Sequence, residues 1–161
     1  MMKRILLILP VLLLFSVSHL FADFQKGLDA YNNGDYATAL NEWRPLAEQG
    51  DIYAQFRLGW MYDYGEGVPE DDREAVKWYT LAAEQGVARA QNNLGWMYDN
   101  GDGVPEDDRE AVKWYTLAAE QGYASAQLSL GWMYDYGRGV PEDDREAVKW
   151  YTLAAEQGYA S

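Results

Sequence analysis

Hydrophobic residues recur with the spacing of α-helices along most of the chain. In the middle of the sequence, Ala90, Leu94, Met97 and Tyr98 occupy positions i, i+4, i+7 and i+8, which fall on one face of a helix. This pattern predicts a helix over about residues 88–99. The hexapeptide LGWMYD, which lies within it, occurs again 36 residues before and 36 residues after, so each copy predicts an equivalent helix.

A second apolar stripe follows in each copy, after a turn rich in Gly and Pro. It predicts a helix over about residues 107–121. The apolar positions recur at i, i+3, i+4, i+7 and i+8: Ala111, Trp114, Tyr115, Ala118 and Ala119. Asp107 and Glu110 match a capping box at its start, and Gly122 suits the left-handed residue just after its end. Each copy is therefore expected to be an antiparallel pair of helices.

The repetition continues through the rest of the chain. The segment GVPEDDREAVKWYTLAAEQG occurs without change at residues 67–86, 103–122 and 139–158. A degenerate copy over residues 24–50 precedes them, and its Pro45 lacks an N–H and is expected to kink its second helix. One helix pair cannot bury its stripe alone, so stability must come from stacking. We therefore predict an all-α fold, a right-handed α-solenoid of about four antiparallel helix pairs.

The first 22 residues have the three-part layout of a secretory signal peptide. Lys3 and Arg4 form a basic start, an apolar run covers residues 5–21, and a polar chain begins at Asp23. The alternative is an uncleaved anchor, but the run is near the lower length limit for a membrane span and polar residues interrupt it. We expect cleavage after residue 22, a periplasmic or secreted protein of residues 23–161, and no stable membrane insertion afterwards.

The net charge and the missing residue types limit the partners and activities that are possible for the mature chain. Removing the signal peptide takes away two basic residues and no acidic ones, so the formal net charge changes from −13 to −15. This charge disfavours nucleic acids and anionic membranes and attracts basic proteins or peptides. There is no Cys, and the one His, His19, lies in the signal segment, so the usual thiol nucleophiles and imidazole bases are missing. We expect no enzymatic activity, no catalytic residue and no cofactor.

The combination of A-Q-x-x-L-G-x-M-Y, G-x-G-V-P and A-V-x-W-Y-x-x-A-A-E-Q-G resembles the SEL-like (Sel-one-like) repeat family, a relative of the tetratricopeptide repeat. The resemblance divides the chain into repeats at 50–85, 86–121 and 122–158, after a tetratricopeptide-like pair at 24–49. It implies a solenoid that presents a concave surface to other proteins and acts as an adaptor. Some exported relatives are Cys-rich and described as β-lactamase-like. This chain lacks those cysteines, which argues against β-lactam chemistry here.

An acidic, Gly-rich loop precedes each second helix, as at residues 63–72. Oxygen ligands of this kind bind calcium, but the spacing does not match a calcium-binding loop. Catalysis by paired carboxylates is another alternative, yet an identical acidic cluster in three copies suggests a structural role. We interpret these acids as helix caps and predict no metal site.

Two features of the first helices indicate a binding surface. Trp60, Trp96 and Trp132 form a column at a position that the family pattern leaves free, and Trp suits contacts with a peptide or a sugar. Packing against the adjacent helix is the alternative. The copies also differ at three positions of one helical face: Tyr53/Arg89/Ser125, Phe56/Asn92/Leu128 and Arg57/Asn93/Ser129. Because Phe56 and Leu128 are apolar on a face expected to be wet, we favour binding over neutral drift.

The last second helix ends where another first helix is due. Its stripe of Trp150, Tyr151, Ala154 and Ala155 repeats the sequence of the inner copies and shows no adaptation to an end position. We expect either a longer repeat protein or an exposed apolar edge that self-associates or frays.

The leading hypothesis is an exported adaptor that binds a protein or peptide, with a preference for basic partners. The alternatives are an enzyme of cell-wall or β-lactam chemistry and a glycan or peptidoglycan binder that uses the Trp column. The candidate partner-binding residues are Tyr53, Phe56, Arg57, Trp60, Arg89, Asn92, Asn93, Trp96, Leu128, Ser129 and Trp132.

Overall fold

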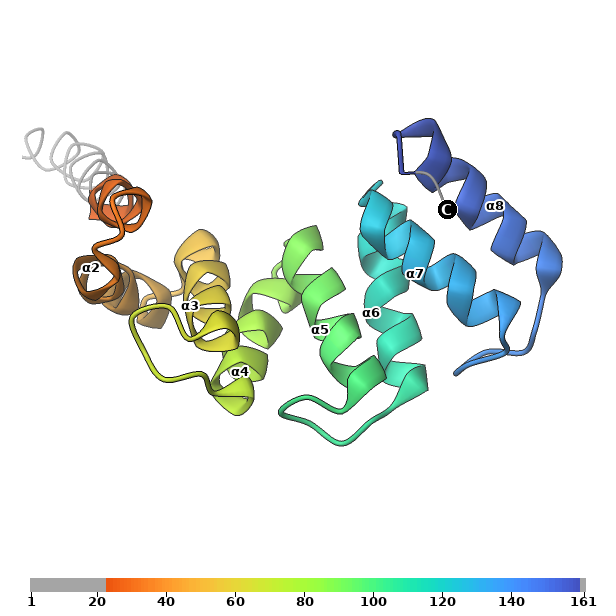
Figure 1. Ribbon diagram of the computed structural model, residues 1–161, viewed down its shortest axis with the longest axis horizontal. Helices are drawn as coiled ribbons and strands as arrows, with labels where there is room; N and C mark the ends of the chain where they lie inside the picture. The colour runs from red at the N-terminus through yellow and green to blue at the C-terminus, as the bar shows by residue number, and fades with distance from the viewer. Residues whose placement is uncertain (1–22, 160–161) are drawn as a thin grey trace, which may run out of the picture.

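The computed structural model describes residues 23–159, whose helices stack side by side along one long axis (Figure 1). A helical segment covers residues 23–32. It is followed by α2 (Tyr36–Glu48), α3 (Ile52–Tyr64), α4 (Asp72–Glu84), α5 (Ala88–Asn100), α6 (Asp108–Glu120), α7 (Ala124–Asp135) and α8 (Asp144–Glu156). The predicted signal peptide lies outside the described residues. No helix in the described range is long and apolar enough to cross a membrane.

The helices form four consecutive pairs, and from α2 to α8 each one packs against the next. Residues 23–159 contain no strand. The helices predicted over residues 88–99 and 107–121 are α5 and α6, and each boundary agrees within one residue. The all-α solenoid predicted from the repeat pattern is confirmed.

Aspartate side chains cap the second helices, as predicted. The Asp107 carboxylate accepts hydrogen bonds from the backbone N–H groups of Arg109 and Glu110, at 3.0 and 3.2 Å. The other half of the predicted capping box is wrong, because the Glu110 carboxylate instead forms an ion pair with Lys113. Asp107 donates its own N–H to the carbonyl of Tyr98 in α5. This bond replaces the return bond from Glu110 and ties together the two helices of the pair.

Two further backbone predictions concern residues at or near helix ends. Gly122 has a φ of +83°, which confirms the left-handed residue expected after α6. In α2, the helix continues through Pro45 to Glu48. Pro45 is exposed and lies near the end of the helix. The carbonyl that loses its hydrogen bond, because Pro45 has no N–H, is therefore on the solvent side.

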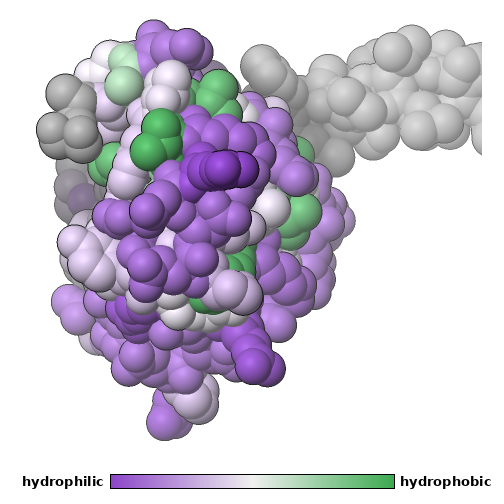
Figure 2. Space-filling model, turned by 90° about the vertical axis from the view of Figure 1, so that its right-hand side faces the viewer, coloured by the Kyte–Doolittle hydropathy of each residue, from purple (hydrophilic) through white to green (hydrophobic). Residues whose placement is uncertain are grey.

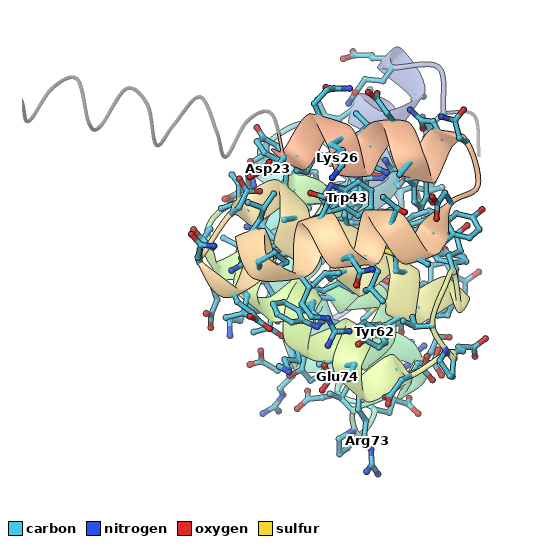
Figure 3. All side chains as sticks on the ribbon, turned by 90° about the vertical axis from the view of Figure 1, so that its left-hand side faces the viewer. Asp23, Lys26, Trp43, Tyr62, Arg73 and Glu74 are labelled. Carbon is cyan, nitrogen blue, oxygen red and sulfur yellow. The ribbon has the colours of Figure 1, made fainter. Side chains whose placement is uncertain are left out.

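The core consists of apolar layers between neighbouring helices. Trp43 is fully buried between the helical segment 23–32 and α2, where its ring stacks 5.8 Å from that of Phe24 (Figure 3). Trp114 is 8% exposed and shares a buried cluster with Ala83 of α4 and Leu94 of α5. The prediction that Trp114 is buried between adjacent units is therefore confirmed.

A glycine in each first helix allows a tyrosine of the second helix to approach closely. A Cβ atom at Gly95 would lie 2.7 Å from the ring of Tyr115, and one at Gly59 would lie 2.5 Å from the ring of Tyr79. Both tyrosines are almost completely buried. The glycine of LGWMYD is therefore required for helix packing, since any side chain would collide with the ring.

A buried glutamine joins three helices at each boundary between pairs. Gln91 of α5 donates through Nε2 to the carbonyl of Ala83 in α4, at 3.0 Å. Its Oε1 accepts a hydrogen bond from Nε2 of Gln121, just after α6, at 2.7 Å. Gln55 and Gln127 make the same two kinds of contact in the neighbouring repeats. These bonds satisfy a buried polar group and fix neighbouring pairs relative to one another.

The end of the molecule at α8 is mostly hydrophilic, with hydrophobic side chains in separate small patches (Figure 2). Trp150 is buried in a cluster with α7 residues, and Ala154 is also buried. The expectation that these two residues need a further helix to cover them is therefore wrong. Tyr151 and Ala155 are more exposed than their counterparts in α6, so the apolar edge is narrower than the sequence pattern suggests.

Candidate partner-binding face

The three tryptophans of the predicted column lie at equivalent positions of α3, α5 and α7. Trp96 is 49% exposed, Trp132 is 38% exposed, and Trp60 is half-buried. The tryptophans of α2, α4, α6 and α8, by contrast, are all buried. Part of each ring in the column is therefore available as a contact surface, although each side chain is more than half buried.

Arginine side chains lie over two of these three rings. The guanidinium of Arg89 is 5.2 Å from the ring of Trp60, and that of Arg138 is 5.3 Å from the ring of Trp132. These distances are within the range of cation–π attraction. Among residues 23–159, no Lys or Arg lies over the ring of Trp96.

The positions that vary between copies are not uniformly exposed. Tyr53 and Arg89 are exposed. Phe56 is only 7% exposed and its ring lies 5.9 Å from that of Tyr79, so the expectation that Phe56 lies on a wet face is wrong. Its side of α3 is covered by α4, the second helix of the same pair. The other varied positions are half-buried: Arg57, Asn92, Asn93, Ser125, Leu128 and Ser129. Only part of the predicted face is therefore open.

The guanidinium of Arg57 contacts the first helix pair. It lies 5.4 Å from the ring centre of Tyr31 and 5.6 Å from that of Trp43. The Tyr31 hydroxyl donates a 2.5 Å hydrogen bond to Glu66, and burial together with this bond raises the pKa of Tyr31 to about 12. Arg57 therefore stabilises the contact between the first two pairs.

A cavity of about 450 Å³ opens between the second and third helix pairs. It is lined by the end of α3, the start of α4, the outer side of α5 and the loop after α5. The lining residues are Asp63, Tyr64, Glu70, Asp72, Asn92, Asn93, Trp96 and Asp102. We refer to it as the acidic cavity, because four of its residues are carboxylic acids. The predicted site residues Asn92, Asn93 and Trp96 meet here.

The acidic groups of this cavity have no basic partner within the described part of the chain. None of the four carboxylates forms an ion pair there. Burial raises the pKa of Asp63, and the nearby charges of Asp72, Asp102 and Glu70 raise it further, while a 3.0 Å hydrogen bond from the Tyr79 hydroxyl opposes them. The cavity therefore concentrates negative charge that the fold does not neutralise.

The boundary between the third and fourth pairs holds Arg138 at the corresponding place. Its Nη1 is 3.0 Å from Asp99 Oδ1, and its Nη2 is 3.0 Å from Glu106 Oε1. Nε donates to Asp108 Oδ2 at 3.1 Å, and Nη2 donates to the other oxygen of Asp108. The same guanidinium covers Trp132. One arginine thus forms ion pairs with three carboxylates and lies over a tryptophan ring.

The acids of residues 63–72 were interpreted as helix caps, and the cavity that Asp63, Glu70 and Asp72 line was not predicted. The helix caps are Asp71, Asp107 and Asp143, whereas the neighbouring Glu70 and Asp72 line the cavity. The available signal was the residue between the two loop glycines, which is Glu66, Asp102 and Arg138 in the three copies. In residues 23–159, no group of three or more His, Cys, Asp or Glu side chains has an arrangement that could hold a metal ion.

Comparison with known proteins identifies similar folds among solved structures. The protective antigen c5321 of uropathogenic Escherichia coli, which displays an SLR fold, has a TM-score of 0.83 and 45% identity, over 87% of this chain and 31% of that one. A Sel1 repeat protein from Oxalobacter formigenes has a TM-score of 0.80 and 39% identity, over 84% of this chain and 56% of that one. Cysteine rich protein B of Helicobacter pylori shares the fold, with a TM-score of 0.61 and 22% identity over 78% of this chain and 90% of that one.

Two curated proteins also match, each named an exopolysaccharide production negative regulator. The one from Rhizobium meliloti is 42% identical over 60 residues, which is 37% of this chain and 22% of the relative. The one from Rhizobium leguminosarum bv. viciae is 40% identical over 57 residues, which is 35% of this chain and 21% of the relative. The chain thus spans about a fifth of the length of these relatives.

The family comparison agrees with the helix pairs. Residues 52–87, 88–123 and 124–159 each match the model of the Sel1 repeat, and each stretch begins at or next to the start of a first helix. Because these matches run without a gap over most of the chain, the protein belongs to the Sel1 repeat family.

Proposed function

We propose that this protein is an exported scaffold that binds a basic protein or peptide on the face formed by its first helices. Sel1 repeats typically serve as protein-interaction scaffolds. The observation that carries the proposal is the exposure of Trp96 and Trp132 on helices whose sequences differ between repeats. The helices α4, α6 and α8 have one identical sequence, so the variation lies in the other helix of each pair and in the loops.

The preference for a basic partner follows from charge. The chain without its first 22 residues carries a net charge of −15, which speeds the approach of basic proteins and repels anionic ones. The acidic cavity adds a local concentration of carboxylates next to Trp96. Aromatic rings beside acidic groups suit the mixed apolar and cationic side chains of Lys and Arg.

Export is supported by the basic and apolar pattern of residues 1–22. N-terminal sequencing of the protein purified from the cell envelope should begin at Asp23. A mature protein that retained Met1 would contradict the cleavage.

The glycan-binding alternative has less support. A sugar platform needs free aromatic faces in a row, but Arg89 and Arg138 lie over the rings of Trp60 and Trp132. Of the three rings of the Trp column, only that of Trp96 has no arginine over it among the described residues. The enzyme alternative draws on Cys-rich relatives, and the 22% identity to one such protein supports a common fold alone.

Site-specific photocrosslinking tests the proposal. A benzoylphenylalanine replaces Tyr53, which is exposed on α3, or Leu117, which is exposed on α6, as a matched control on a second helix. The exported protein is irradiated in intact cells and its adducts are identified by mass spectrometry. We expect a discrete protein adduct from position 53 and little or none from position 117.

The control defines the outcomes that would contradict the proposal. Equal adducts from positions 53 and 117 would place binding elsewhere. Adducts to glycan strands from position 53 would favour the sugar-binding alternative, and an adduct to an acidic protein would contradict the preference for basic partners.

A further inference from the structure

We propose that the acidic cavity between the second and third helix pairs binds an arginine side chain of the partner protein. This inference rests on the proposed function, since it names the chemical group that the scaffold recognises. It is carried by the internal symmetry of the repeats, because the next copy of the same site holds an arginine of the chain itself.

The two sites are built from equivalent residues 36 positions apart. Asp63, Glu70, Asp72 and Trp96 around the acidic cavity correspond to Asp99, Glu106, Asp108 and Trp132 around Arg138. Each tryptophan is exposed to a similar degree. The recognition groups are therefore the same three acids and one aromatic ring at both boundaries.

The loops that enter the two sites also have the same backbone path. Gly103 has a φ of +71° and packs against the backbone of Asp72, and Gly139 has a φ of +68° and packs against the backbone of Asp108. A side chain at either glycine would collide with that backbone. The residue just before each glycine is thereby held beside the acids, and this residue is Asp102 at one site and Arg138 at the other.

Because Asp102 stands where the next site has Arg138, the acidic cavity keeps hydrogen-bond acceptors that no basic side chain satisfies. No basic side chain of residues 23–159 pairs with its carboxylates, whereas Arg138 pairs with all three acids of the other site. Asn92 Oδ1, which lines the cavity, is buried and accepts no hydrogen bond from the described residues. A ligand with several N–H donors and a positive charge fits these unsatisfied acceptors.

The geometry favours a guanidinium over a metal ion or an ammonium group. The acids surround a space of about 450 Å³ and do not converge as metal ligands. At the equivalent site the planar group binds both oxygens of Asp108 while its face covers Trp132. An ammonium group is a compact point charge. It cannot bind both oxygens of a carboxylate with parallel N–H groups while a planar face stacks on an aromatic ring.

The test titrates the exported protein, with its tryptophan indoles labelled for NMR, with the tripeptide acetyl-Gly-Arg-Gly-amide. We expect the indole signal of Trp96 to shift in a saturable manner. The citrulline tripeptide has the same shape without the charge, and it should bind at least about tenfold more weakly because the charge-assisted hydrogen bonds are lost. The lysine tripeptide should also bind more weakly.

The variant Asp102→Arg supplies the matched control, since it gives the cavity the arginine that the next site already has. It should abolish the response of Trp96 to the arginine tripeptide and raise the melting temperature. The reverse variant, Arg138→Asp, should create a second response at Trp132. This second variant keeps the proposal testable if Asp102→Arg does not fold.

Several results would overturn the proposal. Equal shifts with arginine and citrulline would show that charge is not recognised, and equal shifts with arginine and lysine would exclude a guanidinium site. A response to calcium chloride but not to the arginine tripeptide would indicate a metal site. An unchanged response in folded Asp102→Arg would place the tripeptide elsewhere.

The proposed function and this inference can fail separately. If the partner crosslinked at position 53 binds Asp102→Arg as tightly as the wild type, the arginine site is wrong and the scaffold function stands. If the arginine tripeptide binds the cavity but no protein is crosslinked from position 53, the arginine-binding site is supported and the proposed function is wrong.

Discussion

At the scale of single residues, the glycine of each first helix opposes the ordinary helix preference. Replacing an interior helical Gly with Ala normally stabilises a helix by about 1 kcal/mol. At Gly95 the added methyl group would lie 2.7 Å from the ring of Tyr115. We predict that Gly95→Ala destabilises the protein by about 1–3 kcal/mol, the range for overpacked cores. Chemical denaturation measures this change, and a more stable variant would refute the packing role of the glycine.

The two kinds of tryptophan should respond differently to truncation. Trp114 is 8% exposed and lies in the core between adjacent pairs, so Trp114→Ala should lower the free energy of unfolding by about 3–5 kcal/mol. Trp96 is 49% exposed, so Trp96→Ala should lower it by less than half as much. Urea denaturation of both variants provides the comparison. Equal losses would show that the Trp column belongs to the core.

Asp63 should make stability depend on pH. Its pKa is raised in the folded protein, first by burial and then by Asp72 and its acidic neighbours. A carboxyl whose folded pKa exceeds its unfolded value, about 3.9, stabilises the fold when protonated. That contribution is therefore lost as the pH rises from about 4 through the raised folded pKa.

The variant Asp63→Asn tests this dependence, because its amide oxygen can still accept the hydrogen bond from Tyr79. We predict that the variant has a higher melting temperature than the wild type at pH 7. The difference should shrink as the pH falls toward 4. Parallel melting curves at all pH values would contradict the raised pKa of Asp63.

At the scale of helices, the periodic pattern was sufficient to predict the helix pairs. The capping motif predicted the Asp107 cap but not the ion pair that Glu110 forms with Lys113. The periodic pattern was not sufficient to predict the role of Gln91, because a polar residue in an amphipathic helix is ordinarily assigned to the solvent side. The structure places this side chain at 4% exposure, between a carbonyl of α4 and Gln121. A hydrogen bond across three helices has no local signature in the sequence.

Replacing this glutamine tests how firmly it joins neighbouring pairs. Gln91→Leu would remove the two hydrogen bonds of this side chain, to the carbonyl of Ala83 and from Gln121. At about 0.5–1.5 kcal/mol for each bond, we predict a loss of about 1–3 kcal/mol. Gln121→Ala removes only the exposed partner and should have a smaller effect. Thermal unfolding of the two variants compares them. A neutral Gln91→Leu would show that the glutamine contributes nothing to the stacking.

At the scale of the whole molecule, the fold follows from repetition, whereas the acidic cavity depends on contacts between repeats. Asp63 and Asp102 meet only when the second pair stacks on the third. The sequence shows that position 102 differs from position 138 in charge, but it does not show which acids the loop reaches. Phe56 illustrates the same point, since it is buried in a cluster that includes residues of α5, in the next helix pair.

In the three repeats, the two helices of a pair differ in how much they vary between copies. The identical helices α4, α6 and α8 contribute buried Trp and Ala residues, whereas α3, α5, α7 and the loops carry the differences between copies. Under the proposed function, changes at exposed positions of the first helices alter partner choice with little effect on the repeated core. This division accounts for three nearly identical repeats that present three different surfaces.

The affinity of the partner crosslinked at position 53 for two surface variants tests the central claim most directly. Trp96→Ala removes the most exposed ring of the Trp column, and Leu117→Ala removes a similarly accessible apolar side chain of α6. Isothermal titration should show binding weakened at least about tenfold by Trp96→Ala, the loss of a central aromatic contact, and unchanged by Leu117→Ala. Equal affinities for both variants, or a loss confined to Leu117→Ala, would contradict recognition by the first helices.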